Sequence, residues 1–323
     1  MKAIVHERYG PPDVLELRDA DLPSINDDQV LVRVHAASVN PVEWYGVTGP
    51  FFTRLFGGGL RRPKTTTVGA DLAGRIEAVG TGVTELQVGD EVFGTSGASW
   101  AEYAPAREVR LARKPANVSF EEAAAVPVAA ITARQGLRDK GSVQPGQKVL
   151  INGASGGVGT FAVQIAKALG GDVTAVCSTG NVDLVRSLGA DRVVDYTKDD
   201  FTKLDERHEL MLDIAGSQPF RKFRRVLTSD ATVVIVGAKF PSTGVIGPLG
   251  HMLGTRLAAL GRSQTVTFFM ARIEKADLEV MRELLESGQV KPVVDRSFEL
   301  SRAADALSYL GEGHARGKVI ITM

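Results

Sequence analysis

Residues 153–159, Gly-Ala-Ser-Gly-Gly-Val-Gly, form the segment best suited to bind phosphate. They follow the strand-like run 148–152 and precede an amphipathic helical pattern. A helix N-terminus offers unpaired N–H groups and a partial positive charge, which a pyrophosphate reaches only where side chains are missing. We therefore expect a dinucleotide here, with Gly156 and Gly157 allowing close approach and Gly159 letting the helix pack on the strand.

Ala154 stands where the first glycine of G-x-G-x-x-G would be, so this prediction depends on the strand–turn–helix context, and a ligand-free tight turn stays open. The end of the next predicted strand, residues 177–181, favours NADPH over NADH. It contains no carboxylate to repel a 2′-phosphate, and the hydroxyls of Ser178 and Thr179 could bond one. No Arg or Lys lies within these five residues.

The only cysteine, Cys177, excludes an internal disulfide and the usual cysteine sets of zinc dehydrogenases, so we expect no metal. His6, His35, His208 and His251 show no ligand spacing and are interpreted as surface or core residues.

Lys+Arg and Asp+Glu both number 38, which disfavours nucleic acid as a partner. The N-terminus lacks a signal-peptide pattern, and no uncharged run approaches the roughly 18 residues of a membrane helix. We expect a cytoplasmic protein without a membrane partner.

Short alternating strands fill the first hundred residues and predict an antiparallel β unit. Within it, the glycines 57–59 with Arg61 and Arg62 predict a mobile loop. Ser119 and Glu122 have the spacing of a capping box before an Ala-rich helix. From 148 to 237 strands alternate with helices, one of them expected over 219–227, which predicts a parallel sheet. The last elements return to the first unit.

Several motifs resemble the zinc-free branch of the medium-chain dehydrogenase/reductase superfamily, the quinone oxidoreductase and ζ-crystallin-like enzymes. They are residues 146–167, 38–44, 69–74, 88–94 and 313–318, and the similarity covers essentially the full length. Gly69-Ala70-Asp71 stands where zinc-dependent relatives carry Gly-His-Glu. The resemblance implies an α/β protein: a GroES-like β-rich catalytic domain, 1–120 and 266–323, with an inserted doubly wound Rossmann domain, 121–265, that binds NADP.

The same resemblance implies the coenzyme contacts. The pyrophosphate would meet Ser155, Gly157 and Val158, and the adenosine 2′-phosphate end would meet Ser178 and Tyr196. The ribose and nicotinamide end would meet Val236, Gly237, Phe268 and Phe269, with Thr132 against the nicotinamide and His314, Ala315 and Arg316 closing over the coenzyme. Relatives often carry Arg at Gly180, so Arg316 or Lys198 would have to replace it.

Hydride transfer without a metal needs hydrogen-bond donors for the developing oxyanion, which suits a quinone or conjugated enone better than an unactivated alcohol. Tyr45 is the candidate proton donor, or a tyrosine that packs beside Trp44. Asn40 could orient the substrate or the nicotinamide ribose and Glu43 could hold a hydrogen-bond chain to it, or both could cap the turn at Pro41.

We expect an NADPH-dependent reductase of quinones or α,β-unsaturated carbonyls. Two other functions stay open. The first is a non-catalytic, crystallin-like NADPH-binding protein. The second is a carrier-protein enoyl reductase whose Arg54, Arg61, Arg62 and Lys64 meet a phosphopantetheine. The family resemblance also implies a possible homodimer through the edge strand of the Rossmann sheet.

Overall fold

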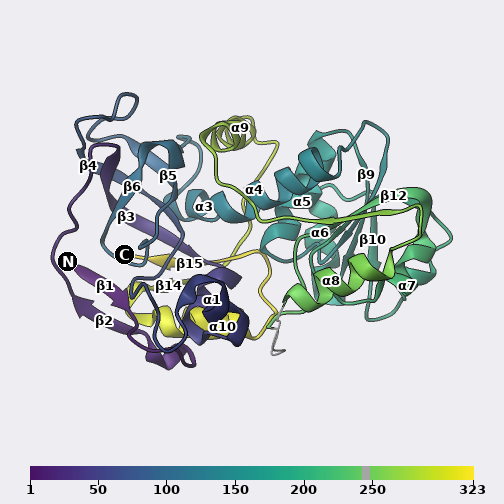
Figure 1. The fold of residues 1–323 in the computed structure, drawn as a ribbon. Helices are drawn as coiled ribbons and strands as arrows, with labels where there is room; N and C mark the ends of the chain where they lie inside the picture. Colours follow the sequence, from purple (N-terminus) through teal and green to yellow (C-terminus); the bar gives the residue numbers. More distant parts are fainter. Residues whose placement is uncertain (242–247) are drawn as a thin grey trace. The chain divides into compact units, whose positions relative to one another are not determined.

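The computed structural model describes residues 1–241 and 248–323. The chain divides into two compact units, one made of residues 1–131 with 272–323 and the other of residues 132–271 (Figure 1). The sequence placed the boundaries at 120 and 265, and these limits stay a prediction. Both chain ends lie in the first unit.

A seven-stranded sheet forms the centre of the first unit. Its strands are β3 Gln29–Val39, β4 Asp71–Val79, β5 Glu91–Thr95, β6 Tyr103–Arg107, β7 Leu111–Arg113, β14 Val294–Glu299 and β15 Lys318–Thr322. The order is β14-β15-β3-β4-β5-β7, with β6 also paired to β3. All pairs are antiparallel except β14 with β15. The antiparallel GroES-like unit expected from the sequence is thus present, and its last strands come from the C-terminus.

A two-stranded sheet and short helices complete this unit. They are β1 Lys2–Val5, β2 Glu16–Asp19, α1 Pro41–Thr48, α2 Phe51–Thr53, α3 Phe120–Ala124, α9 Lys275–Glu286 and α10 Ala303–Gly311. The predicted capping box is confirmed, because the Glu122 N–H donates to Ser119 Oγ at 3.1 Å and the Ser119 N–H to Glu122 Oε2 at 2.7 Å. Buried apolar residues from α1, α10, β3 and β15 form one core cluster.

A six-stranded parallel sheet forms the second unit. Its strands are β8 Lys148–Asn152, β9 Asp172–Cys177, β10 Arg192–Asp195, β11 His208–Asp213, β12 Leu227–Ile235 and β13 Thr265–Phe268. The order β10-β9-β8-β11-β12-β13 is that of a doubly wound dinucleotide-binding sheet. Its helices are α5 Gly157–Ala168, α6 Val182–Ser187, α7 Phe220–Phe223 and α8 Pro248–Ala258, while α4 Pro127–Gln135 crosses the boundary between the units. The fold class expected from the sequence is confirmed.

Two local expectations are met only in part. The helix expected over 219–227 is present as α7 followed directly by the 3₁₀ helix Arg224–Val226, and Phe220, Phe223 and Val226 are buried in one core cluster. The expected loop at 57–59 begins inside a helical segment, Arg54–Gly58. The Tyr9 hydroxyl lies within hydrogen-bond distance of the carbonyls of Gly58 and Gly59 and holds the end of that segment.

Candidate functional site

The turn between β8 and α5 presents free backbone donors. Among the described residues, no backbone carbonyl accepts from the N–H groups of Gly157, Val158 or Gly159. A Cβ on Gly159 would lie 2.1 Å from the Gly153 oxygen, so glycine is required for α5 to approach the turn. Among the described residues, a Cβ on Gly156 would meet only the Gly153 oxygen, at 3.8 Å, so no described side chain fills the space beside it. This donor set fits a pyrophosphate.

The carboxyl end of β9 differs from the expectation that no carboxylate is near. Thr179 Oγ1 donates to Asp195 Oδ2 at 2.7 Å, and Asp195 ends the neighbouring strand β10. The Thr179 hydroxyl hydrogen is thereby used inside the protein and cannot also serve a 2′-phosphate. Hydrogen bonding to Thr179 lowers the pKa of Asp195, so this carboxylate is charged. Residues 177–181 alone could not reveal this carboxylate, because Asp195 comes from the neighbouring strand β10.

Three other residues at this end remain available to a ligand. Ser178 is half-buried, and Tyr196 is 59% exposed. Lys198 Nζ lies 3.7 Å from Asp195 Oδ2, so its positive charge accompanies that carboxylate. Ser178, Tyr196 and Lys198 are therefore grouped by the adjacent ends of β9 and β10.

A buried polar group occupies the carboxyl ends of β8 and β11. The Asp213 carboxylate accepts from Asn152 Nδ2 at 2.8 Å and from the Gly216 N–H at 3.1 Å, and His251 Nε2 on α8 lies 2.9 Å from it. His251, interpreted from sequence as standing without an acidic neighbour, therefore contacts a fully buried aspartate. Spacing along the chain could not show this, since 38 residues separate the two.

The same aspartate also binds the backbone that follows β12. The Asp213 carbonyl accepts from the Val236 N–H at 2.9 Å and the Gly237 N–H at 3.3 Å. A Cβ on Gly237 would lie 2.2 Å from the Ile214 oxygen, so only glycine fits this approach. Phe268 ends β13, next to Ile235 on β12, and Phe269 follows it. The residues assigned to the nicotinamide end thus lie at the carboxyl ends of adjacent strands.

In the first unit, Asn40 belongs to a buried network that we call the Lys318 network, made of Ser38, Asn40, Glu43, Asp71 and Lys318. Asn40 Nδ2 donates to Asp71 Oδ2 at 3.0 Å and to Ser38 Oγ at 3.3 Å. Lys318 Nζ donates to Asn40 Oδ1 and lies 3.6 Å from Asp71 Oδ2. Every polar atom of the Asn40 side chain therefore has a protein partner.

Glu43 joins this network through the backbone. Its Oε2 accepts from the Asn40 N–H at 2.7 Å, and its Oε1 has no partner among the described residues. Burial, together with the nearby Asp71 charge, raises the pKa of Glu43 to about 8. Burial also lowers the pKa of Lys318. The expected hydrogen-bond chain from Glu43 to Asn40 is present, and so is the expected cap, because both features use the same bond.

The remaining predicted residues lie on α1, on α4 and before β15. Tyr45 lies on α1 with its ring edge-to-face against Phe52, centroids 5.3 Å apart, and Thr132 is half-buried in α4. His314, Ala315 and Arg316 precede β15, and the Arg316 N–H donates to Asp295 Oδ2 at 3.0 Å. Arg54, considered for a phosphopantetheine, instead lies over the Tyr9 ring, 4.6 Å from its centroid.

Sequence reasoning missed the roles of Lys318 and Asp71. Lys318 is 3% exposed and Asp71 is fully buried. The signal was present, because both residues stand inside motifs that carry the family resemblance, but the motifs gave no reason to pair them. Strands β4 and β15, which bring them together, are 247 positions apart in the chain.

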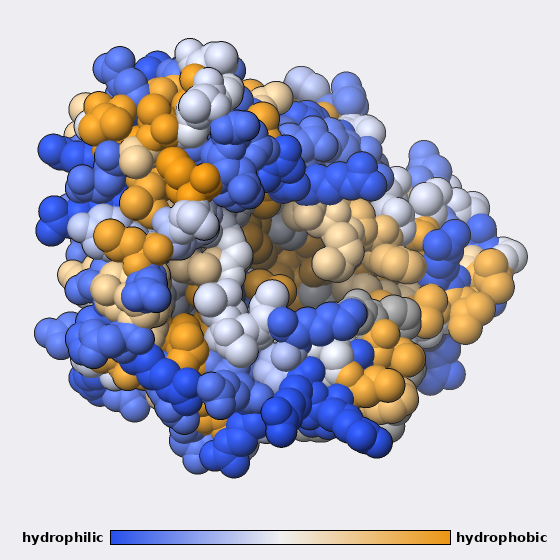
Figure 2. All heavy atoms as spheres, turned by 60° about the vertical axis from the view of Figure 1, so that its left-hand side comes forward, coloured by the Kyte–Doolittle hydropathy of each residue, from blue (hydrophilic) through white to orange (hydrophobic). Residues whose placement is uncertain are grey.

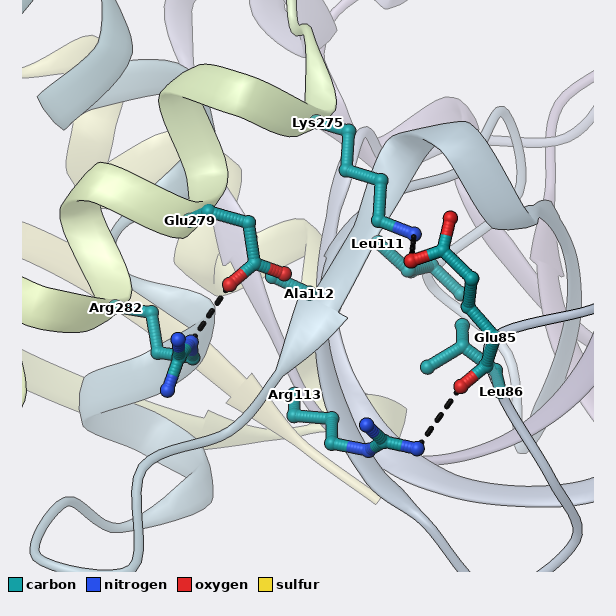
Figure 3. A pocket seen from close by; sticks show the side chains of 8 residues that line it. All are labelled: Glu85, Leu86, Leu111, Ala112, Arg113, Lys275, Glu279 and Arg282. Atoms are coloured by element: carbon teal, nitrogen blue, oxygen red, sulfur yellow. Dashed lines mark hydrogen bonds and ion pairs between the residues drawn. The ribbon is translucent and has the colours of Figure 1, made fainter.

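A separate pocket of 170 Å³ lies between β7 and α9 (Figure 3). Its charged side chains are paired with each other, as in Lys275 with Glu85 at 2.8 Å and Arg282 with Glu279 at 2.7 Å. None of the predicted site residues lines it. Within residues 1–241 and 248–323, no group of three His, Cys, Asp or Glu side chains could hold a metal, and no helix is long and apolar enough to cross a membrane.

Comparison with known proteins agrees with this arrangement. Residues 26–134 match the alcohol dehydrogenase GroES-like domain, and residues 188–321 match the zinc-binding dehydrogenase family. The chain is 36% identical to the 2-methylene-furan-3-one reductase of Solanum lycopersicum, with 99% of this chain and 79% of that protein covered. It is 35% identical, at the same coverage, to the chloroplastic NADPH-dependent alkenal/one oxidoreductase of Arabidopsis thaliana. The quinone oxidoreductase structure from Coxiella burnetii superposes with a TM-score of 0.87 at 28% identity, covering 100% of this chain and 99% of that one.

Proposed function

The chain belongs to the quinone and alkenal/one oxidoreductase family of the medium-chain dehydrogenase/reductase superfamily, and from this premise we propose that it reduces quinones or α,β-unsaturated carbonyls with NADPH. The observation that carries the coenzyme part is the set of free N–H groups at the Gly157 end of α5. When bound there, the reduced nicotinamide supplies the hydride.

The substrate class rests on chemistry as well as on the relatives' names. Cys177 alone cannot supply the cysteine sets of zinc dehydrogenases, so the proposal assigns stabilisation of the oxyanion to hydrogen-bond donors. A quinone or enone spreads that charge by conjugation, whereas a simple alcohol product or substrate does not. Two relatives are named for reducing a conjugated ketone and alkenals or enones, which supports this class.

Tyr45 is the proposed proton donor. Its phenol can hydrogen-bond an oxyanion and then deliver the proton. Asn40 and Glu43 are proposed as positioning residues, because their hydrogen bonds run within the Lys318 network. They would fix the start of α1, whose N-cap residue is Asn40. Tyr45 follows Asn40 by five residues on the same helix.

NADPH is proposed over NADH for three reasons. Ser178 and Tyr196 are the residues proposed for the adenosine end, the Lys198 cation lies 3.7 Å from Asp195 at the end of the neighbouring strand, and a relative is named for NADPH. Asp195 and the glycine at position 180 oppose this preference, so we expect NADH to bind as well, but more weakly. Arg316 and His314 complete the proposed coenzyme contacts, together with Ala315 and Thr132.

The proposal is tested by following NADPH oxidation with ortho-quinones, para-quinones, enones and enals, with and without a chelator. We expect turnover of activated acceptors that the chelator leaves unchanged. Tyr45→Phe should lower kcat about 10²-fold or more, as expected for loss of a general acid. NADH should support the same reactions at a higher KM.

Three outcomes would contradict parts of this proposal. Alcohol oxidation that a chelator abolishes would show metal chemistry instead. Coenzyme binding without turnover of any acceptor would favour the crystallin-like alternative. Turnover confined to carrier-bound enoyl thioesters would favour the enoyl reductase, for which the exposed Arg61, Arg62 and Lys64 remain in place. The proposal also keeps a cytoplasmic location, in line with the single, buried thiol.

A further inference from the structure

Asn181 connects two serines that come from different turns of the second unit. Its Nδ2 donates to Ser178 Oγ at 3.0 Å and to Ser155 Oγ at 3.2 Å. Ser155 belongs to the glycine turn after β8, and Ser178 directly follows β9. The Asn181 residue is 8% exposed, whereas both serines are half-buried and reach the surface.

In residues 1–241 and 248–323, the Asn181 side chain makes no other hydrogen bond. Asn181 is the N-cap of α6, a position where an asparagine oxygen normally accepts from the first turn of the helix. Here the side chain makes no such cap bond. Its Oδ1 is buried and has no hydrogen-bond partner among the described residues. A buried acceptor without a donor costs free energy. The Asn181 amide is therefore oriented by its hydrogen bonds to the two serines and not by a bond to the helix.

This geometry sets the polarity of both hydroxyl groups. A serine hydroxyl can donate or accept, but each Oγ here already accepts from the Asn181 amide. In the described part of the chain, neither hydroxyl donates to a protein acceptor. Both hydroxyl hydrogens are therefore left to donate to a ligand at the surface. Phosphate oxygens carry negative charge and only accept, so they match this polarity.

We propose that Asn181 is a positioning residue for the coenzyme, which turns Ser155 and Ser178 into fixed donors toward the pyrophosphate and the adenosine 2′-phosphate, respectively. The inference rests on the proposed function, since it assigns the phosphates to that coenzyme. It adds a single side chain that sets both phosphate contacts. Because Ser178 meets a phosphate only in NADPH, Asn181 also contributes to the choice between the two coenzymes.

The test is calorimetric titration of the full chain with NADPH and, in a separate experiment, with NADH. Asn181→Ala should weaken NADPH about tenfold and NADH about threefold, since NADPH loses two oriented donors and NADH one. Ser178→Ala should weaken NADPH and leave NADH unchanged. In the Ser178→Ala background, Asn181→Ala should weaken NADPH only about as much as it weakens NADH in the wild type, because one shared serine is gone.

The matched control is Asp183→Ala, two residues along on α6, whose side chain is 99% exposed; it should bind both coenzymes like the wild type. Equal losses for NADPH and NADH in Asn181→Ala, unchanged by Ser178→Ala, would overturn the proposal and leave a purely structural role. If Asn181→Ala does not fold, Asn181→Asp keeps the shape but accepts from both hydroxyls, and unchanged NADPH binding by it would overturn the proposal. A wild type that binds neither coenzyme would instead remove the proposed function.

Discussion

In the first unit, the buried charges determine whether Glu43 carries a proton. Lys318 is the cation nearest two acids, Asp71 and Glu43, in a place where burial penalises every charged form. One positive charge compensates one negative charge, so the second acid is held in its neutral form. Glu43 takes that place, because its Oε1 has no donor whereas Asp71 accepts from Ser38, Asn40 and the Val128 N–H.

This charge balance gives a prediction for Glu43→Gln. The folded-state pKa of Glu43, about 8, lies above the ordinary value of 4.5, so the folded protein holds a proton that the unfolded chain releases. Wild-type stability should therefore fall as pH rises from about 4.5 to about 8. Glutamine resembles the protonated acid, so its advantage over the wild type should grow over this range, by on the order of a few kcal/mol. Urea unfolding at several pH values measures it.

Glu77→Gln provides the matched control, because Glu77 is exposed on β4. Its stability relative to the wild type should not change with pH. A constant difference between Glu43→Gln and the wild type from pH 5 to 8.5 would show that Glu43 is charged in the folded protein, contrary to this account.

At the scale of elements, two glycines at the start of α5 have different roles. Gly159 lets the helix lie against the turn, whereas no described residue other than Gly153 comes within 4 Å of a Cβ at Gly156. Gly159→Ala places a methyl 2.1 Å from the Gly153 oxygen and should destabilise the fold by about 1–3 kcal/mol, as overpacking does. Thermal and urea unfolding measure this loss.

Gly156→Ala is the matched variant at the same turn. Its backbone angles, φ −82° and ψ 178°, suit alanine, so stability should be retained. The added methyl should instead weaken NADPH binding in calorimetry, because it stands where the pyrophosphate approaches. If Gly156→Ala lost stability and Gly159→Ala did not, the two glycines would have the opposite roles.

Sequence periodicity predicted most elements of the second unit. The pattern of α5 is strong, since its residues from Gly159 to Ala166 are all buried. Over 219–227 the pattern predicted a helix but not its type, because a 3₁₀ turn buries the same apolar residues as a continued α-helix. The edge strand β13 was not predicted at all, since its half-exposed residues follow no clear alternation.

At the scale of the molecule, the parallel sheet ends in a free edge. Within the part of the chain that the structure describes, strand β13 pairs on one side only, with β12. Nearby, Leu257 and Leu260 are 65% and 70% exposed, and Met270 is 89% exposed. Figure 2 shows a face on which hydrophilic residues predominate, with hydrophobic ones in smaller groups between them. An open edge with apolar neighbours is a site for strand pairing between copies.

We expect a homodimer that uses this edge. Light scattering after size exclusion should give twice the 34.4 kDa chain mass. Thr267→Pro, which removes a backbone donor from β13, should shift the protein to the monomer, whereas Asp183→Ala should leave the dimer intact. A wild type that elutes as a monomer at micromolar concentration would refute the dimer.

The sequence by itself determined the parallel sheet and the glycine turn after β8, because those features depend on residues close along the chain and on the space that glycine leaves, and its motifs over the full length indicated the family. Only the tertiary structure decided which polar groups meet. Asp195 beside Thr179, His251 on Asp213, Lys318 on Asn40 and Asn181 between two serines all join residues from separate elements. A buried polar group must find a partner wherever the fold supplies one, and sheet order, which spacing along the chain does not encode, decides which partner that is.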